Sequence, residues 1–188
     1  MRRLSGMSEI NEEYKQVILG EKEKQKIQDC LDYLEKKREQ SDAPIYGVNT
    51  GFGSLRNHKI FNMDLGQLQT NLVLSHSCGT GDKVPADVVK IMLLLKVQSL
   101  SYGHSGVQLK TVERLIEMFN KNILPVVFQQ GSLGASGDLA PLAHLSLPLL
   151  GEGKVIVDGE EVETKTIMKS NGWEAIALQS KEGLALLN

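Results

Sequence analysis

Three small residues, Ala135, Ser136 and Gly137, stand at the centre of "QGSLGASGDLAPLAHL" (130–145), directly before an apolar segment. Gly137 has an amide nitrogen that no side chain shields, and Ala135 offers a carbonyl carbon two residues earlier. In a tight turn that nitrogen can attack that carbonyl and close a five-membered ring, with loss of one water. Loss of the Ser136 hydroxyl as a second water leaves an exocyclic methylene, so the backbone becomes a conjugated electrophile. Side chains supply nucleophiles, acids and bases but no strong electrophile.

Other catalytic motifs are missing from the sequence. "GASG" is not GxSxG, so Ser136 is a poor candidate for a hydrolase nucleophile. "GTGDK" does not match the phosphate-binding loop GxxxxGK[ST]. The histidines and cysteines show no metal-ligand spacing, so we expect no metal. Most tripeptides of this kind are merely turns, and from the local residues alone a plain turn remains the alternative.

The segments that must position this turn are mainly helical. Apolar residues recur at helical spacing in 22–39, 85–100 and 112–119, and 85–100 is apolar nearly all round, which is typical of a helix in a large core or an oligomer. Further helices are expected at 64–76, with Asp64 as N-cap, at 138–150 and at 166–172. In 138–150, Asp138 is the expected cap and Pro148 should kink the helix. "KVIVDGEEVE" (154–163) predicts a β-hairpin with an Asp-Gly turn.

A glycine-rich loop, "IYGVNTGFGSLRNH" (45–58), precedes these helices. Its glycines and asparagines forbid a long regular element, yet its apolar residues make it unlike a solvated linker. Such a loop often lines a pocket, where backbone must approach a ligand closely.

Composition excludes several classes of partner. The 188 residues carry a formal charge of -2, which gives no electrostatic reason to expect a nucleic acid or an anionic membrane. The longest apolar run, 91–95, is far too short to span a bilayer, and the N-terminus lacks a secretory signal. Nothing shows that the two cysteines, Cys30 and Cys78, pair, so we expect a cytoplasmic protein with reduced thiols.

The stretch "GSLGASGDLAPLAHL" strongly resembles the signature of the aromatic amino acid lyase family. The blocks "YGVNTGFG", "NLVLSHSCGTG", "GHSGV", "GEG" and "KEGLALLN" are similar to further blocks of the family, in the family's order, from about residue 14 to residue 188. The resemblance implies the N-terminal part of the L-aspartase-like helical superfold. It also implies that Ala135, Ser136 and Gly137 cyclise to 4-methylideneimidazole-5-one (MIO), the cofactor of the family.

The resemblance also assigns roles in the reaction to other residues. Tyr46 matches the tyrosine taken as the base that removes the substrate β-proton. Asn188 matches the asparagine that contacts the MIO ring and the substrate. Asn49 and Gly53 share the loop of Tyr46, and Gly53 is expected to let the substrate carboxylate approach the backbone.

Ser75 and His76 match the place where family members acting on histidine commonly carry Ser-His. The implied reaction is non-oxidative elimination of ammonia from L-histidine to give trans-urocanate. Relatives that act on tyrosine, as ammonia-lyases or aminomutases, also place a histidine here, so tyrosine remains an alternative substrate. A catalytically inactive fragment that serves only as a binding module is a second alternative.

The resemblance further implies that 1–188 is the N-terminal MIO-forming domain of a homotetrameric enzyme, truncated before its C-terminal helical domain. The apolar residues 184–187 at the end of the chain agree with truncation. We therefore expect the fragment alone not to turn over, and the three residues to remain uncyclised if the truncated pocket cannot compress them.

Overall fold

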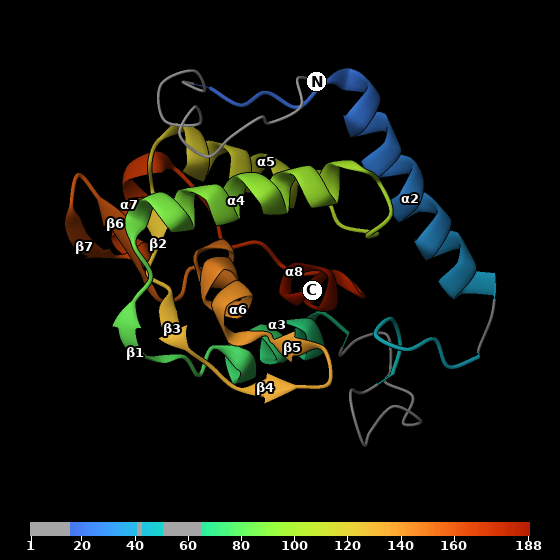
Figure 1. Cartoon of the computed structure of the whole chain (residues 1–188). Coiled ribbons are helices and arrows are strands. Elements are labelled where there is room, and N and C mark those ends of the chain that lie inside the picture. Colours follow the sequence, from blue (N-terminus) through green and yellow to red (C-terminus); the bar gives the residue numbers. More distant parts are fainter. Residues whose placement is uncertain (1–15, 41–42, 51–64) are drawn as a thin grey trace, which may run out of the picture.

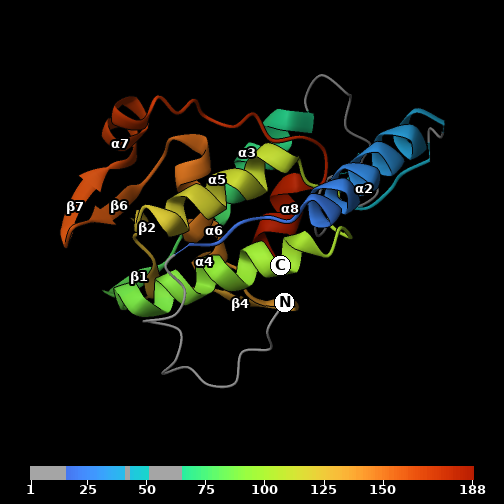
Figure 2. The same cartoon turned by 90° about the horizontal axis from the view of Figure 1, so that it is seen from above.

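The computed structural model of the chain describes residues 16–40, 43–50 and 65–188. Its two long central helices, α4 (Ala86–Ser101) and α5 (Leu109–Asn120), lie side by side, and α2 (Glu21–Gln40) lies at one end of them (Figure 1 and Figure 2). On the other side of α4, three short helices pack against one another: α3 (Leu65–His76), α6 (Ala140–Ser146) and α8 (Glu182–Leu187). This mainly helical fold agrees with the expected fold class.

The apolar patterns of α4 and α5 explain why these helices form the centre of the core. The predicted stripe of α5 is buried, and it includes Val112 and Leu115, both with no exposed surface. On α4 only one face is buried, because Val88 and Leu95 are 42% and 51% exposed. Within the described part of the chain α4 is therefore not enclosed on every face, and the alternative that the sequence offered, burial in an oligomer, stays a prediction.

Short antiparallel strands connect the helices. The predicted hairpin is confirmed, with Asp158 and Gly159 at positive φ (51° and 85°) as a tight Asp-Gly turn requires. The sequence patterns did not predict three further pairs, because strands of two to four residues are too short to show an alternating pattern. The pairs are β1 (Thr80–Lys83) with β3 (Phe128–Gln130), β2 (Leu124–Pro125) with β6 (Lys154–Val157), β6 with β7 (Glu160–Glu163), and β4 (Leu133–Gly134) with β5 (Gly137–Asp138).

The helix expected at 138–150 is shorter than predicted. Asp138 belongs to β5, Leu139 occupies the N-cap position, and α6 ends at Ser146. The chain then continues as a 3-10 helix, η4 (Leu147–Leu150), rather than as a kinked α-helix. Pro148 accounts for the change, because it has no N–H to donate and its ring displaces the carbonyl four residues earlier.

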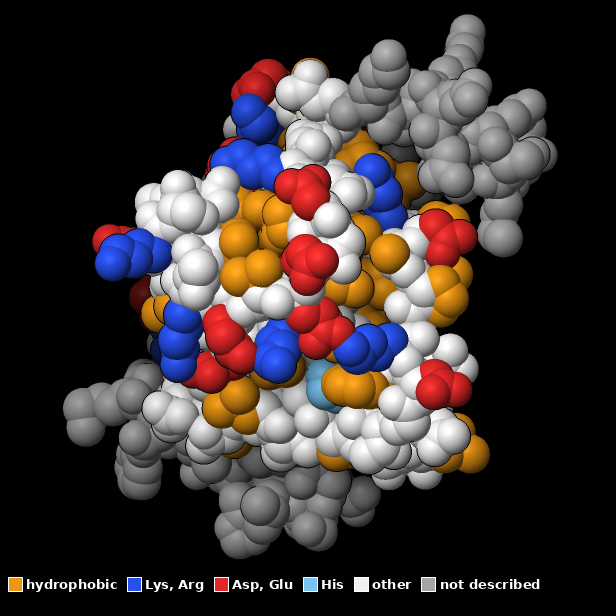
Figure 3. All heavy atoms as spheres, turned by 90° about the vertical axis from the view of Figure 1, so that its left-hand side faces the viewer, with side chains coloured by type: hydrophobic (Ala, Val, Ile, Leu, Met, Phe, Trp, Pro, Cys, Tyr) orange, Lys and Arg blue, Asp and Glu red, His pale blue; other side chains and the backbone are white. Residues whose placement is uncertain are grey.

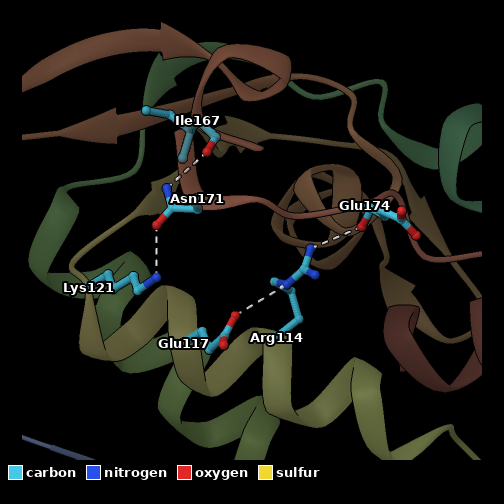
Figure 4. Close-up of polar contacts among 6 residues, drawn as sticks. All are labelled: Arg114, Glu117, Lys121, Ile167, Asn171 and Glu174. Carbon is cyan, nitrogen blue, oxygen red and sulfur yellow. Dashed lines mark hydrogen bonds and ion pairs between the residues drawn. The ribbon is translucent and has the colours of Figure 1, made fainter. Parts of the chain in front are cut away.

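Helix α7 (Thr164–Asn171) begins two residues before the expected 166–172 helix and is tied to α5 (Figure 4). Lys121 Nζ donates to Asn171 Oδ1 at 2.8 Å, and an Arg114 guanidinium nitrogen donates to the Glu174 carbonyl at 3.2 Å. The same guanidinium lies 4.5 Å from the centre of the Trp173 ring, which adds a cation–π contact. The segment after the hairpin is thereby fixed on the core before it reaches α8.

Acidic and basic side chains are mixed on the face at the hairpin end of the molecule, with hydrophobic side chains between them (Figure 3). Lys83 of β1 pairs with Glu161 of β7, and Lys154 pairs with Glu163 across the hairpin at 3.7 Å. This face therefore presents no block of one charge. Among the described residues no helix combines the length and the apolar character needed to cross a membrane.

Candidate active site

The Ala-Ser-Gly turn (residues 135–137) lies at the tip of a hairpin formed by β4 and β5. Gly134 pairs with Gly137 and Leu133 with Asp138, so Ala135 and Ser136 form a two-residue turn. Gly137 has a φ of 90°, a conformation that L side chains rarely adopt. A Cβ atom at this position would have no neighbour within 4 Å, so the glycine is required by the backbone and not by crowding.

The Asp138 carboxylate ties the two sides of this hairpin together. Its Oδ1 accepts a hydrogen bond from the Ser132 amide at 3.1 Å and another from the Ala140 amide at 3.0 Å. It therefore caps the start of α6, one position before the N-cap residue. A Cβ atom at Gly131 would lie 2.1 Å from the same Oδ1, so a side chain at this position would displace the carboxylate. The residues before and after the turn are thus held close to one another.

An open cavity of about 350 Å³ lies beside the turn. It brings together residues from the end of α3 and from the hairpin. Its lining consists of Ser75, His76, Cys78, Ser132, Gly134, Ala135, Ser136, Gly137, Leu139 and Ala140. The structure therefore places the predicted specificity pair and the predicted cofactor-forming residues around one space.

The orientation of His76 is set by the last turn of α3. Its Nδ1 lies 2.8 Å from the carbonyl oxygen of Leu72. Because a carbonyl oxygen only accepts, Nδ1 carries the proton, and Nε2 of the neutral ring is an acceptor. The Ser75 hydroxyl lies 3.2 Å from the same Nδ1 and donates to the same carbonyl at 3.1 Å. His76 can therefore offer Nε2 to an N–H or O–H donor.

Cys78 is a residue of this cavity that sequence reasoning did not single out. Its thiol is free and exposed. It follows the Ser-His pair by two residues, so its place in "SHSCG" was the available signal. Among the described residues, no group of histidine, cysteine, aspartate and glutamate side chains could hold a metal ion.

His144 supports the cavity from behind. Its Nε2 accepts a hydrogen bond from the Gly79 amide at 3.0 Å, and its ring lies edge-on to Phe128 at 5.1 Å. Burial lowers the pKa of His144, since the charged imidazolium is poorly solvated there. The contact joins α6 to the chain after α3, two elements that line the cavity.

Tyr46 and Asn49 lie in the loop that the sequence placed at the pocket. The Tyr46 side chain is 55% exposed, whereas Asn49 is buried. Asn49 Oδ1 accepts from the Ile45 amide at 2.6 Å, and its Nδ2 donates to the Ala43 carbonyl at 3.1 Å. The amide of Asn49 thus closes the loop on itself. Neither residue lines the cavity, and Gly53 and Asp64 lie outside the described residues.

Asn188 follows α8, which packs against α3 and α6. Its Nδ2 donates to the Leu184 carbonyl at 3.4 Å, and the residue is exposed. It does not line the cavity, so the structure brings its helix beside the site without bringing its side chain into it.

A second cavity of similar volume, about 360 Å³, lies between 17–20 and α4. Its lining is mostly apolar and contains none of the predicted site residues. We place the candidate site at the Ala-Ser-Gly turn, because the cavity beside that turn contains groups able to recognise and react with a ligand.

The fold and the site together define a helical domain that presents an Ala-Ser-Gly turn beside a histidine. The sequence profile of the aromatic amino acid lyase family matches residues 3–188. The chain therefore belongs to the aromatic amino acid lyase family.

Known relatives agree with this assignment. The chain is 52% identical over 153 residues to a histidine ammonia-lyase of Legionella pneumophila (strain Corby), a match that covers 81% of the chain and 30% of that protein. It is 42% identical to the histidine ammonia-lyase of Bacillus subtilis (strain 168) over 194 residues, or 100% of the chain and 38% of that protein. The chain thus spans about a third of the length of these curated relatives.

Solved structures show the same fold. A tyrosine aminomutase from Streptomyces globisporus superposes with a TM-score of 0.87 at 38% identity, over 96% of the chain and 34% of that structure. A histidine ammonia-lyase from Trypanosoma cruzi superposes with a TM-score of 0.84 at 32% identity, over 97% of the chain and 35% of that structure.

Proposed function

We propose that the chain is the MIO-forming part of a carbon–nitrogen lyase that converts L-histidine to trans-urocanate and ammonia. The observation that carries the proposal is the shared cavity, which places the His76 imidazole beside the Ala-Ser-Gly turn. The names of the relatives from Legionella pneumophila and Bacillus subtilis support histidine as the substrate.

The residues of the turn fit the MIO group. The two-residue turn and the positive φ of Gly137 bring the Ala135 carbonyl and the Gly137 amide close in sequence and in space, and the tip of the hairpin has room for a ring. Condensed with loss of two waters, the three residues supply an electrophile for the substrate amine. Asp138 holds the two sides of the turn together while they condense.

Other residues recognise the substrate and move its proton. His76 accepts a hydrogen bond at Nε2, which suits the N–H of a substrate imidazole. Tyr46 takes the β-proton, and Asn49 holds the loop that presents it. Asn188 contacts the reacting centre from the end of α8 in the completed pocket, since neither Asn188 nor Tyr46 lines the cavity of this chain. Ser75 supports His76, and Gly53 admits the substrate carboxylate.

The proposal includes an assembly larger than this chain. Residues 1–188 form the N-terminal part, and a C-terminal helical domain completes the pocket in a cytoplasmic homotetramer. The chain alone is then inactive, and its partner is a small amino acid rather than a nucleic acid or a membrane. Urocanate production by the purified chain alone would contradict the inactivity.

Tyrosine is the second candidate substrate. The similarity to a tyrosine aminomutase favours it, and an acceptor at His76 Nε2 suits a phenol hydroxyl as well as an imidazole N–H. An inactive binding module is a third candidate, and it predicts that the Ala-Ser-Gly turn keeps its two waters.

A chimera tests the substrate directly. In it the chain replaces the corresponding part of the Bacillus subtilis relative, which matches the whole chain. We expect elimination of ammonia from L-histidine in preference to L-phenylalanine, because a pocket with a polar partner rejects analogues that cannot pair with it. We expect L-histidine to be preferred to L-tyrosine as well, because the relatives from Legionella pneumophila and Bacillus subtilis are named histidine ammonia-lyases. A folded chimera that has lost the two waters and prefers L-tyrosine would overturn the histidine assignment.

A further inference from the structure

Helix α8 carries Asn188 at its C-cap, yet it has only six residues. Helices of that length are not stable on their own in water, because the cost of nucleation exceeds the gain from so few hydrogen bonds. The position of Asn188 therefore depends on what holds α8 from outside. The structure shows two buried charged side chains in this role, one at each end of the helix.

Glu182, the first residue of α8, has no exposed surface. Its Oε1 accepts from the Gln108 amide at 3.0 Å and from the Thr111 hydroxyl. Its Oε2 accepts from Gln108 Nε2 at 2.6 Å and from the Gln179 amide at 2.8 Å. Gln108 is the N-cap residue of α5 and Thr111 lies in its first turn, so one carboxylate joins the starts of two helices.

Lys96 from α4 holds the other end of α8. The residue is 5% exposed, and its Nζ donates to the carbonyl oxygen of Ala185 at 3.1 Å and to a main-chain oxygen of Asn188, the last residue of the sequence, at 2.6 Å. No aspartate or glutamate among the described side chains forms an ion pair with it. Burial lowers the pKa of Lys96 to about 8, since the charged ammonium group is poorly solvated there.

A third contact fixes α8 against α3, the helix of His76. Gly183 packs so closely that a Cβ atom would lie 2.7 Å from the Gln69 carbonyl oxygen. The Gln69 side-chain oxygen accepts from the Leu184 amide at 3.3 Å. The contact resists rotation of α8, while the charged ends resist its sliding.

Stability alone is a weak reason for these charges. An acidic group at the start of a helix and a basic group at its end match the helix dipole. Buried charges are nevertheless costly, and apolar replacements of a similar shape are often at least as stable. We propose that Glu182 and Lys96 are positioning residues that fix α8 and, through it, Asn188. The catalytic meaning of this inference rests on the proposed function, but the placement of α8 is measurable without it.

The test is NMR on the 188-residue chain with Lys96→Met, which keeps the aliphatic stem and removes the donors. We expect amide exchange in α8 to become about tenfold faster, the effect of losing a hydrogen bond to a charged group, and the side-chain amide signal of Asn188 to shift. Lys96→Arg should restore both, since it keeps the charge and the donors. Lys90→Met is the matched control on the same helix, because Lys90 Nζ bonds the exposed Asn122 side chain and lies over the Phe119 ring of α5 at 5.3 Å, away from α8.

An unchanged rate of amide exchange in α8 of Lys96→Met would overturn the proposal. An increase in α3 and α5 as large as that in α8 would also overturn it, since such a result indicates a general loss of stability. If Lys96→Met does not fold, Thr111→Val removes one donor to Glu182 and should loosen α8 in the same local way. In the chimera, Lys96→Met should lower kcat with little change in KM. A chimera without turnover would overturn the proposed function and leave the NMR result on α8 intact.

Discussion

Replacement of Asp138 by alanine should loosen the hairpin that carries the Ala-Ser-Gly turn. The carboxylate accepts from the Ser132 and Ala140 amides at 3.1 and 3.0 Å. A hydrogen bond to a charged group contributes about 1.5–3 kcal/mol when it is sheltered. Asp138 is exposed, so about 1 kcal/mol for each bond, or roughly 2 kcal/mol in total, is the expected loss. For a chain of this length that corresponds to a fall in Tm of about 4–8 °C.

Calorimetry measures the loss of stability, and intact mass measures the fraction of chains that have lost two waters. Asp138→Asn is the matched control, because both bonds end on the same oxygen and an amide keeps one oxygen acceptor. We expect Asp138→Ala to lower both quantities and Asp138→Asn to stay close to wild type. Equal behaviour of the alanine variant and wild type would refute the role of this carboxylate, and equal damage in both variants would refute the hydrogen-bond explanation.

Three further predictions concern buried or site residues. The pKa of Lys96 in the folded chain, about 8, lies below the ordinary 10.5. Between these two values the unfolded chain binds more protons, so the free energy of unfolding should rise with pH, by up to about 3 kcal/mol. Urea unfolding of Lys96→Met should show no such rise. The pKa of His144 is also lowered, so the free energy of unfolding should fall as the pH drops below the ordinary 6.5. Urea unfolding of His144→Gln, which keeps an acceptor for the Gly79 amide, should show a smaller fall over the same pH range. In the chimera, His76→Leu should reduce kcat/KM for L-histidine by about a hundredfold or more, and an unchanged value in a steady-state assay would remove His76 from substrate recognition.

The sequence predicted the elements whose patterns are long or chemically specific. The stripe of α5 and the Asp-Gly turn after β6 follow from local residues alone, and the structure confirms both. The position of His76 beside the Ala-Ser-Gly turn could be expected only through the family resemblance, because no pattern in the residues between them indicates that the two lie close together in space.

Contacts between distant parts of the chain were not predictable. Lys96 and Asn188 are far apart in sequence, and "LLLKVQ" predicts no more than an apolar helix with one charge. His144 and Gly79 are likewise distant in sequence, and they come into contact because α6 packs against the end of α3. The start of α6 was misplaced because Asp138 caps the helix from a strand, which a linear pattern does not distinguish from an ordinary N-cap.

The central claim is that Ala135, Ser136 and Gly137 condense into the electrophile of the family. The most direct test is the intact mass of the purified chain, with Ser136→Ala as the control that lacks the hydroxyl lost as the second water. We expect the wild-type chain to be lighter than its sequence mass by two waters, about 36 Da, and the Ser136→Ala chain not to show this loss. A wild-type chain at its full sequence mass, also within the chimera, would contradict it.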